Sequence, residues 1–187
     1  MEKRLTAIDI ANAFADLSLR DDIAISKTKL HKLVFFTYEK CILGKNDELT
    51  PLFDDEVRAE KNGFYYPSIN AEIKGKFPDI NGDGTGIVDK MLIAPDKAKI
   101  LPHEVEQKIR EVWHDYKHKS DDYVISYSHT YDIWKAHADD KGIITPQEIA
   151  EYRKKYNEVM EQTKLDIEKT FKAFGDVSWN NSRWWRG

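Results

Sequence analysis

The sequence contains a single cysteine, Cys41, among its 187 residues, so an intrachain disulfide is excluded. A lone thiol in an apolar stretch, with no activating base beside it, is typical of a reduced and buried side chain. Long hydrophobic runs are missing as well, since no stretch approaches the roughly 20 apolar residues that span a bilayer. The charged N-terminal segment is not followed by the apolar segment of a secretory signal. We therefore expect a cytoplasmic protein with no membrane partner.

Positive charge is in deficit, because 29 lysines and arginines stand against 33 aspartates and glutamates, for a net charge of -4. A nucleic-acid binder normally needs a basic field, so the balance argues against nucleic acid as a partner. Charged residues make up 33% of the chain, yet aromatics reach 12%, which is typical of a folded domain with solvated faces. The length fits one domain that can bury a core without disulfides.

Apolar residues at helical spacing predict two helices near the N-terminus. The first runs from about Thr6 to Leu19. The second begins after Ser26, whose hydroxyl caps it, and we expect Gly44 to end it in a left-handed conformation. The predicted buried faces of these two helices carry Ile10, Phe14, Leu17, Leu30, Leu33 and Val34.

A strand pattern follows between Leu52 and Pro67, where charged and apolar residues alternate from Glu56 to Glu60. Beyond the glycine-rich stretch 81–86, the apolar stretch 87–93 predicts a second short strand or hairpin arm. Two further helices are predicted, one with Pro102 in its first turn and a short one capped by Ser120.

Thr145-Pro146-Gln147-Glu148 predicts a capped start for a helix of about 30 residues that ends at Gly175. Such a helix packs along the domain or projects from it. The expected fold is therefore mainly α with a small β element: a compact helical domain with a short hairpin and a long C-terminal helix. We expect a core at 1–144, the long helix at 145–175 and a tail at 176–187.

Two groups of residues partly match known metal sites. Asp79, Asn81 and Asp83 fit the first positions of a calcium loop, but Lys90 stands where the closing glutamate belongs, which favours a polar turn. His114 and His118 are spaced to share a metal ion, but a third ligand, His129 or His137, cannot be placed. No nucleophile elbow, Walker loop or dinucleotide motif is present. We expect no enzyme, metal or cofactor.

The C-terminal tail is rich in tryptophan and arginine, a composition typical of the residues that dominate binding energy at protein interfaces. A tail that folds back and covers the domain explains the same composition, so both interpretations stay open. The candidate partner-binding residues of the tail are Trp179, Arg183, Trp184, Trp185 and Arg186.

Four segments together resemble the Panacea antitoxin domain, the SocA-like family of bacterial and phage genomes. They are residues 25–36, with a lysine-leucine-rich helix pattern, the acidic strand pattern 52–60, the aromatic loop 63–68, and 127–134 around Trp134. The sequence departs from the family pattern at Glu60, where tryptophan is usual, at Phe64 and Tyr65, which replace proline and valine, and at Ile133, which replaces proline. The resemblance covers about residues 5–156.

The resemblance implies an antitoxin that binds and neutralises a toxin encoded beside it, and some such domains resemble adaptors that deliver the toxin to a protease. Tyr65, Tyr66 and Trp134 join the tail as expected partner-binding residues. Two alternatives stay open: a metal-binding or enzymatic protein that uses the Asp79–Asp89 loop or the pair His114 and His118, and a phage or host regulatory adaptor that binds a host protein. The sequence does not predict an oligomeric state.

Overall fold

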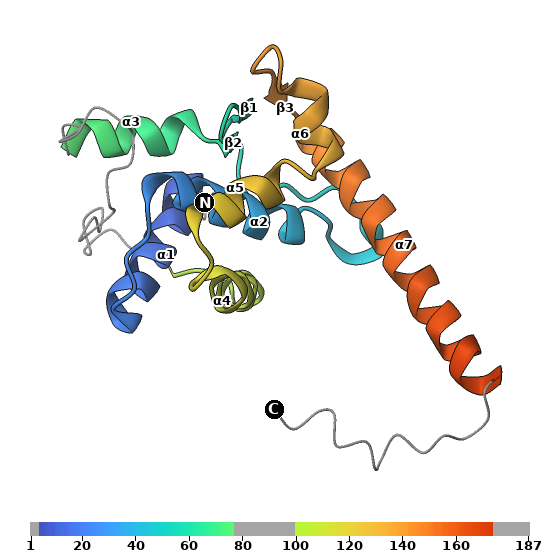
Figure 1. The fold of residues 1–187 in the computed structure, drawn as a ribbon. Helices are drawn as coiled ribbons and strands as arrows, with labels where there is room; N and C mark the ends of the chain where they lie inside the picture. Colours follow the sequence, from blue (N-terminus) through green and yellow to red (C-terminus); the bar gives the residue numbers. More distant parts are fainter. Residues whose placement is uncertain (1–3, 77–99, 174–187) are drawn as a thin grey trace. The chain divides into compact units, whose positions relative to one another are not determined.

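The computed structural model describes residues 4–76 and 100–173 (Figure 1). The chain is mainly helical with a small antiparallel sheet and a long C-terminal helix, as predicted. It divides into two units, Met1–Arg153 and Lys154–Gly187, and the boundary lies within the last helix. The described helices and strands, in chain order, are α1 (Ala7–Asp21), α2 (Lys27–Cys41), the short 3-10 helix η1 (Lys45–Asp47), β1 (Val57–Glu60), β2 (Gly63–Tyr65), α3 (Pro67–Lys76), α4 (His103–Tyr116), α5 (Asp121–Ser128), α6 (Asp132–His137), β3 (Ile143–Ile144) and α7 (Pro146–Ala173).

Helix α2 is the centre of the first unit. It packs against α1, α4, α5 and β2, and every residue from Lys29 to Glu39 is buried. A surface helix buries only one stripe, so burial around the whole circumference requires partners for its polar side chains. The Lys29 ammonium donates to the backbone carbonyls of Lys117 and Lys119, at 3.0 and 2.6 Å. The Thr37 hydroxyl donates to the Leu33 carbonyl at 3.1 Å, and Glu39 pairs with Arg153.

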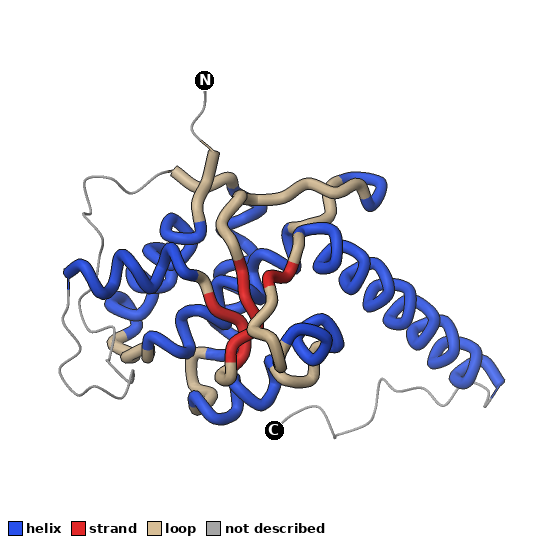
Figure 2. The backbone as a smooth tube through the Cα atoms, turned by 90° about the horizontal axis from the view of Figure 1, so that it is seen from above, coloured by secondary structure: helices blue, strands red, loops and turns tan. Residues whose placement is uncertain are grey.

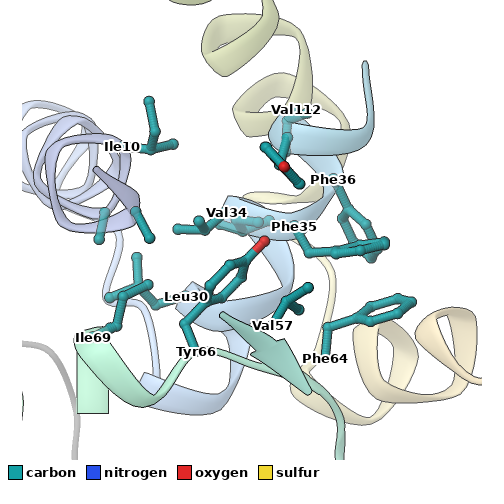
Figure 3. Packing of buried hydrophobic residues seen from close by; sticks show 14 of the residues in the cluster. Ile10, Leu30, Val34, Phe35, Phe36, Val57, Phe64, Tyr66, Ile69 and Val112 are labelled. Carbon is teal, nitrogen blue, oxygen red and sulfur yellow. The ribbon is translucent and has the colours of Figure 1, made fainter. Parts of the chain in front are cut away.

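The core gathers around α2, and aromatic rings dominate one side of it (Figure 3). Phe35 stacks on Phe64 of β2 with ring centroids 3.4 Å apart, and Tyr131 meets both rings edge-on. Edge-on and stacked pairs add to the stability gained from burying the rings. The aromatic contacts therefore fix the hairpin and the segment before α6 against the central helix.

Leu33 lies at the centre of this packing and is fully buried. We expect Leu33→Ala to lower the free energy of unfolding by about 2–5 kcal/mol, because the neighbours cannot close the cavity completely. Urea denaturation followed by circular dichroism measures the change. An unchanged denaturation midpoint would contradict the burial of this face of α2.

The sheet has three antiparallel strands in the order β2-β1-β3 (Figure 2). The β1–β2 hairpin pairs Arg58 with Tyr65 and Glu60 with Gly63. On its other edge, β1 pairs Val57 with Ile144 of β3. Val57 and Ala59 face the core and are buried, which confirms the alternation predicted from the sequence.

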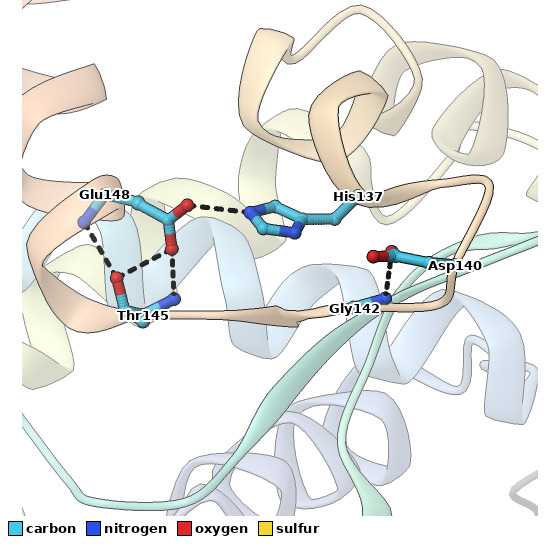
Figure 4. Close-up of polar contacts among 5 residues, drawn as sticks. All are labelled: His137, Asp140, Gly142, Thr145 and Glu148. Atoms are coloured by element: carbon cyan, nitrogen blue, oxygen red, sulfur yellow. Dashed lines mark hydrogen bonds and ion pairs between the residues drawn. The ribbon is translucent and has the colours of Figure 1, made fainter.

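Local capping determines where several helices begin. The Ser26 hydroxyl accepts a hydrogen bond from the Lys29 amide at 2.9 Å, and the Ser120 hydroxyl accepts one from the Tyr123 amide at 3.2 Å. At α7, the Thr145 amide and hydroxyl donate to Glu148 at 2.8 and 2.7 Å, and the Glu148 amide donates back at 3.2 Å (Figure 4). These bonds satisfy amides that a helix start leaves without intrahelical partners, and they confirm the predicted caps.

Other details of the prediction are wrong or incomplete. Gly44 does not end α2 in a left-handed conformation: the helix ends at Cys41, and Gly44 has a φ of -80°. Its amide instead donates to the Glu48 carbonyl at 2.9 Å, in a turn where Leu43 bridges to Leu49. Helices α3 and α6 and strands β2 and β3 were not predicted. The predicted strand at 87–93 and the tail at 176–187 lie outside the described residues.

Candidate protein-binding surface

Helix α7 carries apolar side chains at the surface beyond Arg153. Val159, Met160 and Ile167 are 50–56% exposed, although they are large and apolar. With Thr163 they form what we call the α7 stripe. Tyr156 and Phe171, also large and exposed, lie on the same side at its two ends. Contiguous exposed apolar side chains on one face of an element are a mark of protein-binding sites.

The stripe follows from the spacing of the sequence. Met160, Thr163 and Ile167 recur at intervals of three and four, so they lie along one side of a helix that turns once every 3.6 residues. Lysines and acidic residues occupy most other positions, and Lys169 pairs with Asp166 at 3.6 Å. The part of α7 beyond Arg153 is thus a charged helix with one narrow apolar seam, the pattern of helices that pair side by side.

The first two turns of α7 are different, because they belong to the core. Ile149 and Ala150 are buried, and Arg153 Nη1 lies 3.2 Å from the Glu39 carboxylate in α2. The sequence shows one continuous apolar series along this helix. The structure divides it at Arg153 into a part buried in the first unit and a part that is exposed.

Two of the predicted partner-binding residues lie in the β2 region. Tyr66 is fully buried, and its backbone amide donates to His31 Nδ1 at 3.1 Å, so its burial removes it from any binding surface in this structure. Tyr65 is half-buried, and its ring lies 4.9 Å from that of His31. Of this pair, only Tyr65 is partly accessible at the surface.

Trp134 is half-buried and has internal contacts. Its indole N–H donates to the Glu60 carbonyl at 3.1 Å, and its ring stacks on His129 with centroids 3.8 Å apart. These contacts hold α6 against the end of β1 and support a scaffold role for Trp134. The other predicted residues, Trp179, Arg183, Trp184, Trp185 and Arg186, lie outside the described residues.

The histidines do not gather with other metal ligands. Within residues 4–76 and 100–173, no three histidine, cysteine, aspartate or glutamate side chains lie close enough to hold a metal ion. His114 is highly exposed, and His137 Nε2 lies 2.7 Å from the Glu148 carboxylate. The Asp79–Asp89 loop lies outside the described residues. Cys41 is half-buried, and burial raises the pKa of its thiol to about 11, which keeps it protonated at neutral pH.

Sequence reasoning missed a group of buried polar residues at the start of α2. Lys32 and His31 are 3% and 2% exposed, and both line a cavity between α2 and the β1–β2 turn. Lysine is almost never fully buried without a partner, so the burial of Lys32 could not be predicted from the residue type. The resemblance to a lysine-leucine-rich family pattern included Lys32 but implied no role for it.

Comparison with known proteins adds no relative to this picture. No protein-family model, no curated protein and no solved structure matches the chain. In the described part of the chain, no helix has the length and apolar character needed to cross a membrane.

Proposed function

We propose that this protein is a cytoplasmic antitoxin that neutralises a cognate protein toxin by binding it, without catalysing a reaction. The α7 stripe is the observation that supports the binding part of the proposal, because it exposes apolar side chains that a partner would bury. The identity of the partner as a toxin rests on the resemblance to the Panacea domain.

Burial of the stripe supplies the driving force. Removal of apolar surface from water is worth roughly 25 cal/mol per Å², so three half-exposed large side chains and their counterparts can contribute several kcal/mol. Their spacing of three and four residues fits the ridge of a second helix or an apolar groove. We therefore propose a toxin that presents an apolar helix or groove. The mixed charges beside the stripe would select the partner at the rim of the interface.

Co-expression tests the antitoxin proposal. The open reading frame adjacent to this one is expressed in a heterologous bacterium, alone or with this chain, and growth is measured. We expect its product to arrest growth alone and to be harmless when this chain is present. If neither neighbouring product is toxic, or if the chain restores no growth, the antitoxin proposal is wrong. Should the chain instead capture a host protein, the regulatory adaptor becomes the better interpretation.

A substitution in the stripe tests how the partner is bound. We expect Ile167→Glu to weaken partner binding at least thirty-fold, because a central apolar contact is worth about 2 kcal/mol or more and an acid at this position would be desolvated. Isothermal titration calorimetry with the co-purified partner measures the change.

Leu165→Glu is the matched control, because Leu165 is also exposed but lies two residues, or about 200°, around the helix from Ile167. It should bind within about twofold of the wild type. Equal loss in both variants would exclude a directional stripe while leaving the antitoxin role intact. The stripe could instead bind a second copy of this chain, and light scattering of the chain alone tests this. If the chain is a dimer and Ile167→Glu abolishes the dimer, the stripe is a homodimer interface and not a toxin-binding site.

A further inference from the structure

A cavity of about 320 Å³ lies between the first turns of α2 and the turn of the β1–β2 hairpin. Lys27, Thr28, His31 and Lys32 form the wall contributed by α2. The hairpin contributes Glu60, Lys61, Asn62 and Tyr65. The volume falls in the range of small-molecule sites, and every lining residue carries a polar group.

Two polar groups in this wall have no protein partner among the described residues. The Lys32 ammonium has no hydrogen bond or ion pair within the described ranges 4–76 and 100–173, although the residue is only 3% exposed. Burial lowers the pKa of Lys32 to about 7, while Asp121 and Glu60 act in the opposite direction from a distance. A largely desolvated ammonium without a counter-ion is unfavourable, and an anion in the cavity would offset that cost.

His31 provides the second group. Its Nδ1 accepts a hydrogen bond from the Tyr66 amide, so the neutral ring carries its proton on Nε2. Burial, with help from Lys32 and Lys27, lowers the pKa of His31 to about 3, which keeps the ring neutral. The Nε2–H is buried and has no acceptor among the described residues. The other polar side chains of α2 that are buried do have partners, which sets this end of the helix apart.

The charges of the lining indicate the class of ligand. Three lysines face one carboxylate, Glu60, and the Lys141 ammonium lies 3.5 Å from that carboxylate. The N-terminus of α2 adds a positive dipole at the same wall, because Lys27 and Thr28 are its first residues. A singly charged carboxylate would leave this field largely uncompensated, whereas a phosphate dianion matches it and offers enough acceptors for the lysine, histidine and threonine donors.

We propose that this cavity binds the phosphate group of a small molecule, with Lys32 as its buried counter-ion and Lys27 and Lys61 at the rim. This site is independent of the α7 stripe and goes beyond toxin binding. It would couple occupancy by a phosphorylated ligand to the stability of the first unit, since a ligand that binds only the folded state stabilises it.

The test is a titration of the full-length chain followed by amide NMR at constant ionic strength. Inorganic phosphate, ribose 5-phosphate and acetate are the probes. We expect saturable shifts of the amides from Lys27 to Lys32 with both phosphates, at least tenfold tighter than with acetate. Tighter binding of ribose 5-phosphate than of inorganic phosphate would identify a phosphate ester as the ligand, and the reverse order would identify the free ion.

Lys32→Met should weaken phosphate binding at least tenfold, whereas Lys155→Met, the same loss of charge on the exposed side of α7, should bind within twofold of the wild type. If Lys32→Met fails to fold, Lys61→Gln replaces it, because Lys61 is exposed, and a severalfold loss is expected. Phosphate that shifts no amide in this segment, acetate that binds as tightly as phosphate, or a variant at Lys32 or Lys61 that binds like the wild type would overturn the proposal.

Discussion

Gly63→Ala is expected to lower the free energy of unfolding by about 2–5 kcal/mol, measured by chemical denaturation. Gly63 begins β2 with a φ of +94°, a region that costs an L-residue roughly 1–2 kcal/mol. A Cβ at this position would lie 2.1 Å from Ser128 Oγ and 2.9 Å from Lys32 Cε. Ser128 is fully buried and its hydroxyl donates to the Ile125 carbonyl at 2.7 Å, so overpacking adds roughly 1–3 kcal/mol.

Two further variants separate these causes. Ser128→Ala in the Gly63→Ala background removes the atom closest to the new Cβ. It should restore the stability lost to the steric clash, but not the stability lost to backbone strain. Gly142→Ala is the matched control at a glycine without positive φ, where the added Cβ would meet only the side-chain atoms His137 Nδ1 and Asp140 Oδ1 within 3 Å. A Gly63→Ala protein as stable as the wild type would show that β2 and α5 do not approach each other as described.

Arg153→Met is expected to destabilise the protein by about 3 kcal/mol at neutral pH. Glu39 is 5% exposed at its side chain and Arg153 is 22% exposed, so removal of the arginine leaves a buried carboxylate without this partner. Loss of one member of a buried pair costs roughly 3–5 kcal/mol, and the partial exposure of Arg153 places the expected value at the lower end. Denaturation curves at several pH values measure the effect.

The effect of Arg153→Met should depend on pH in a defined direction. Burial raises the pKa of Glu39, and Arg153 and Lys40 offset part of that rise, so the variant raises it further. A carboxyl whose pKa is raised on folding contributes its stability below the unfolded pKa and loses it as the pH rises through the folded pKa. The deficit should therefore shrink as the pH is lowered from neutral and Glu39 takes up a proton.

Glu39→Gln in the Arg153→Met background is the control, because it removes the charge and keeps the shape. It should restore much of the lost stability and abolish the pH dependence. A deficit that is the same at every pH would show that Arg153 contributes packing alone.

Elements that depend on residues close together in the sequence were predicted well. The start of α7 needs only Thr145, Pro146 and Glu148, and all the bonds of its cap lie within one turn, so the pattern was sufficient. The buried face of α4 follows in the same way from the spacing of Val105, Ile109 and Val112. Elements that depend on contacts between residues far apart in the sequence were not predicted. Strand β3 has two residues and no periodicity of its own, and it exists because Val57 pairs with Ile144.

In the candidate sites, too, local patterns were predicted from the sequence, whereas features that depend on distant contacts were not. The apolar series of α7 is visible in the sequence, but the end of its buried part is set by contacts with α2 and not by any change in pattern. Tyr66 and Lys32 carry polar groups that usually stay near water, so their burial was not expected. Lys32 is buried because α2 is covered on every side, and Tyr66 because it packs against His31 of that helix, so both depend on the fold and not on the local sequence.

The order of the strands has a consequence for synthesis on the ribosome. Strand β1 lies in the middle of the sheet, yet β3, its second neighbour, is translated only after α3 to α6. Until then the side of β1 that β3 will cover has no strand beside it, and open strand edges recruit other strands. Strand β3 covers this side of β1 once Ile143 and Ile144 have left the ribosome. Ile149, which is buried in the core, follows a few residues later. Emergence of the segment from Ile143 to Ile149 therefore protects the central strand, β1, from pairing with other chains.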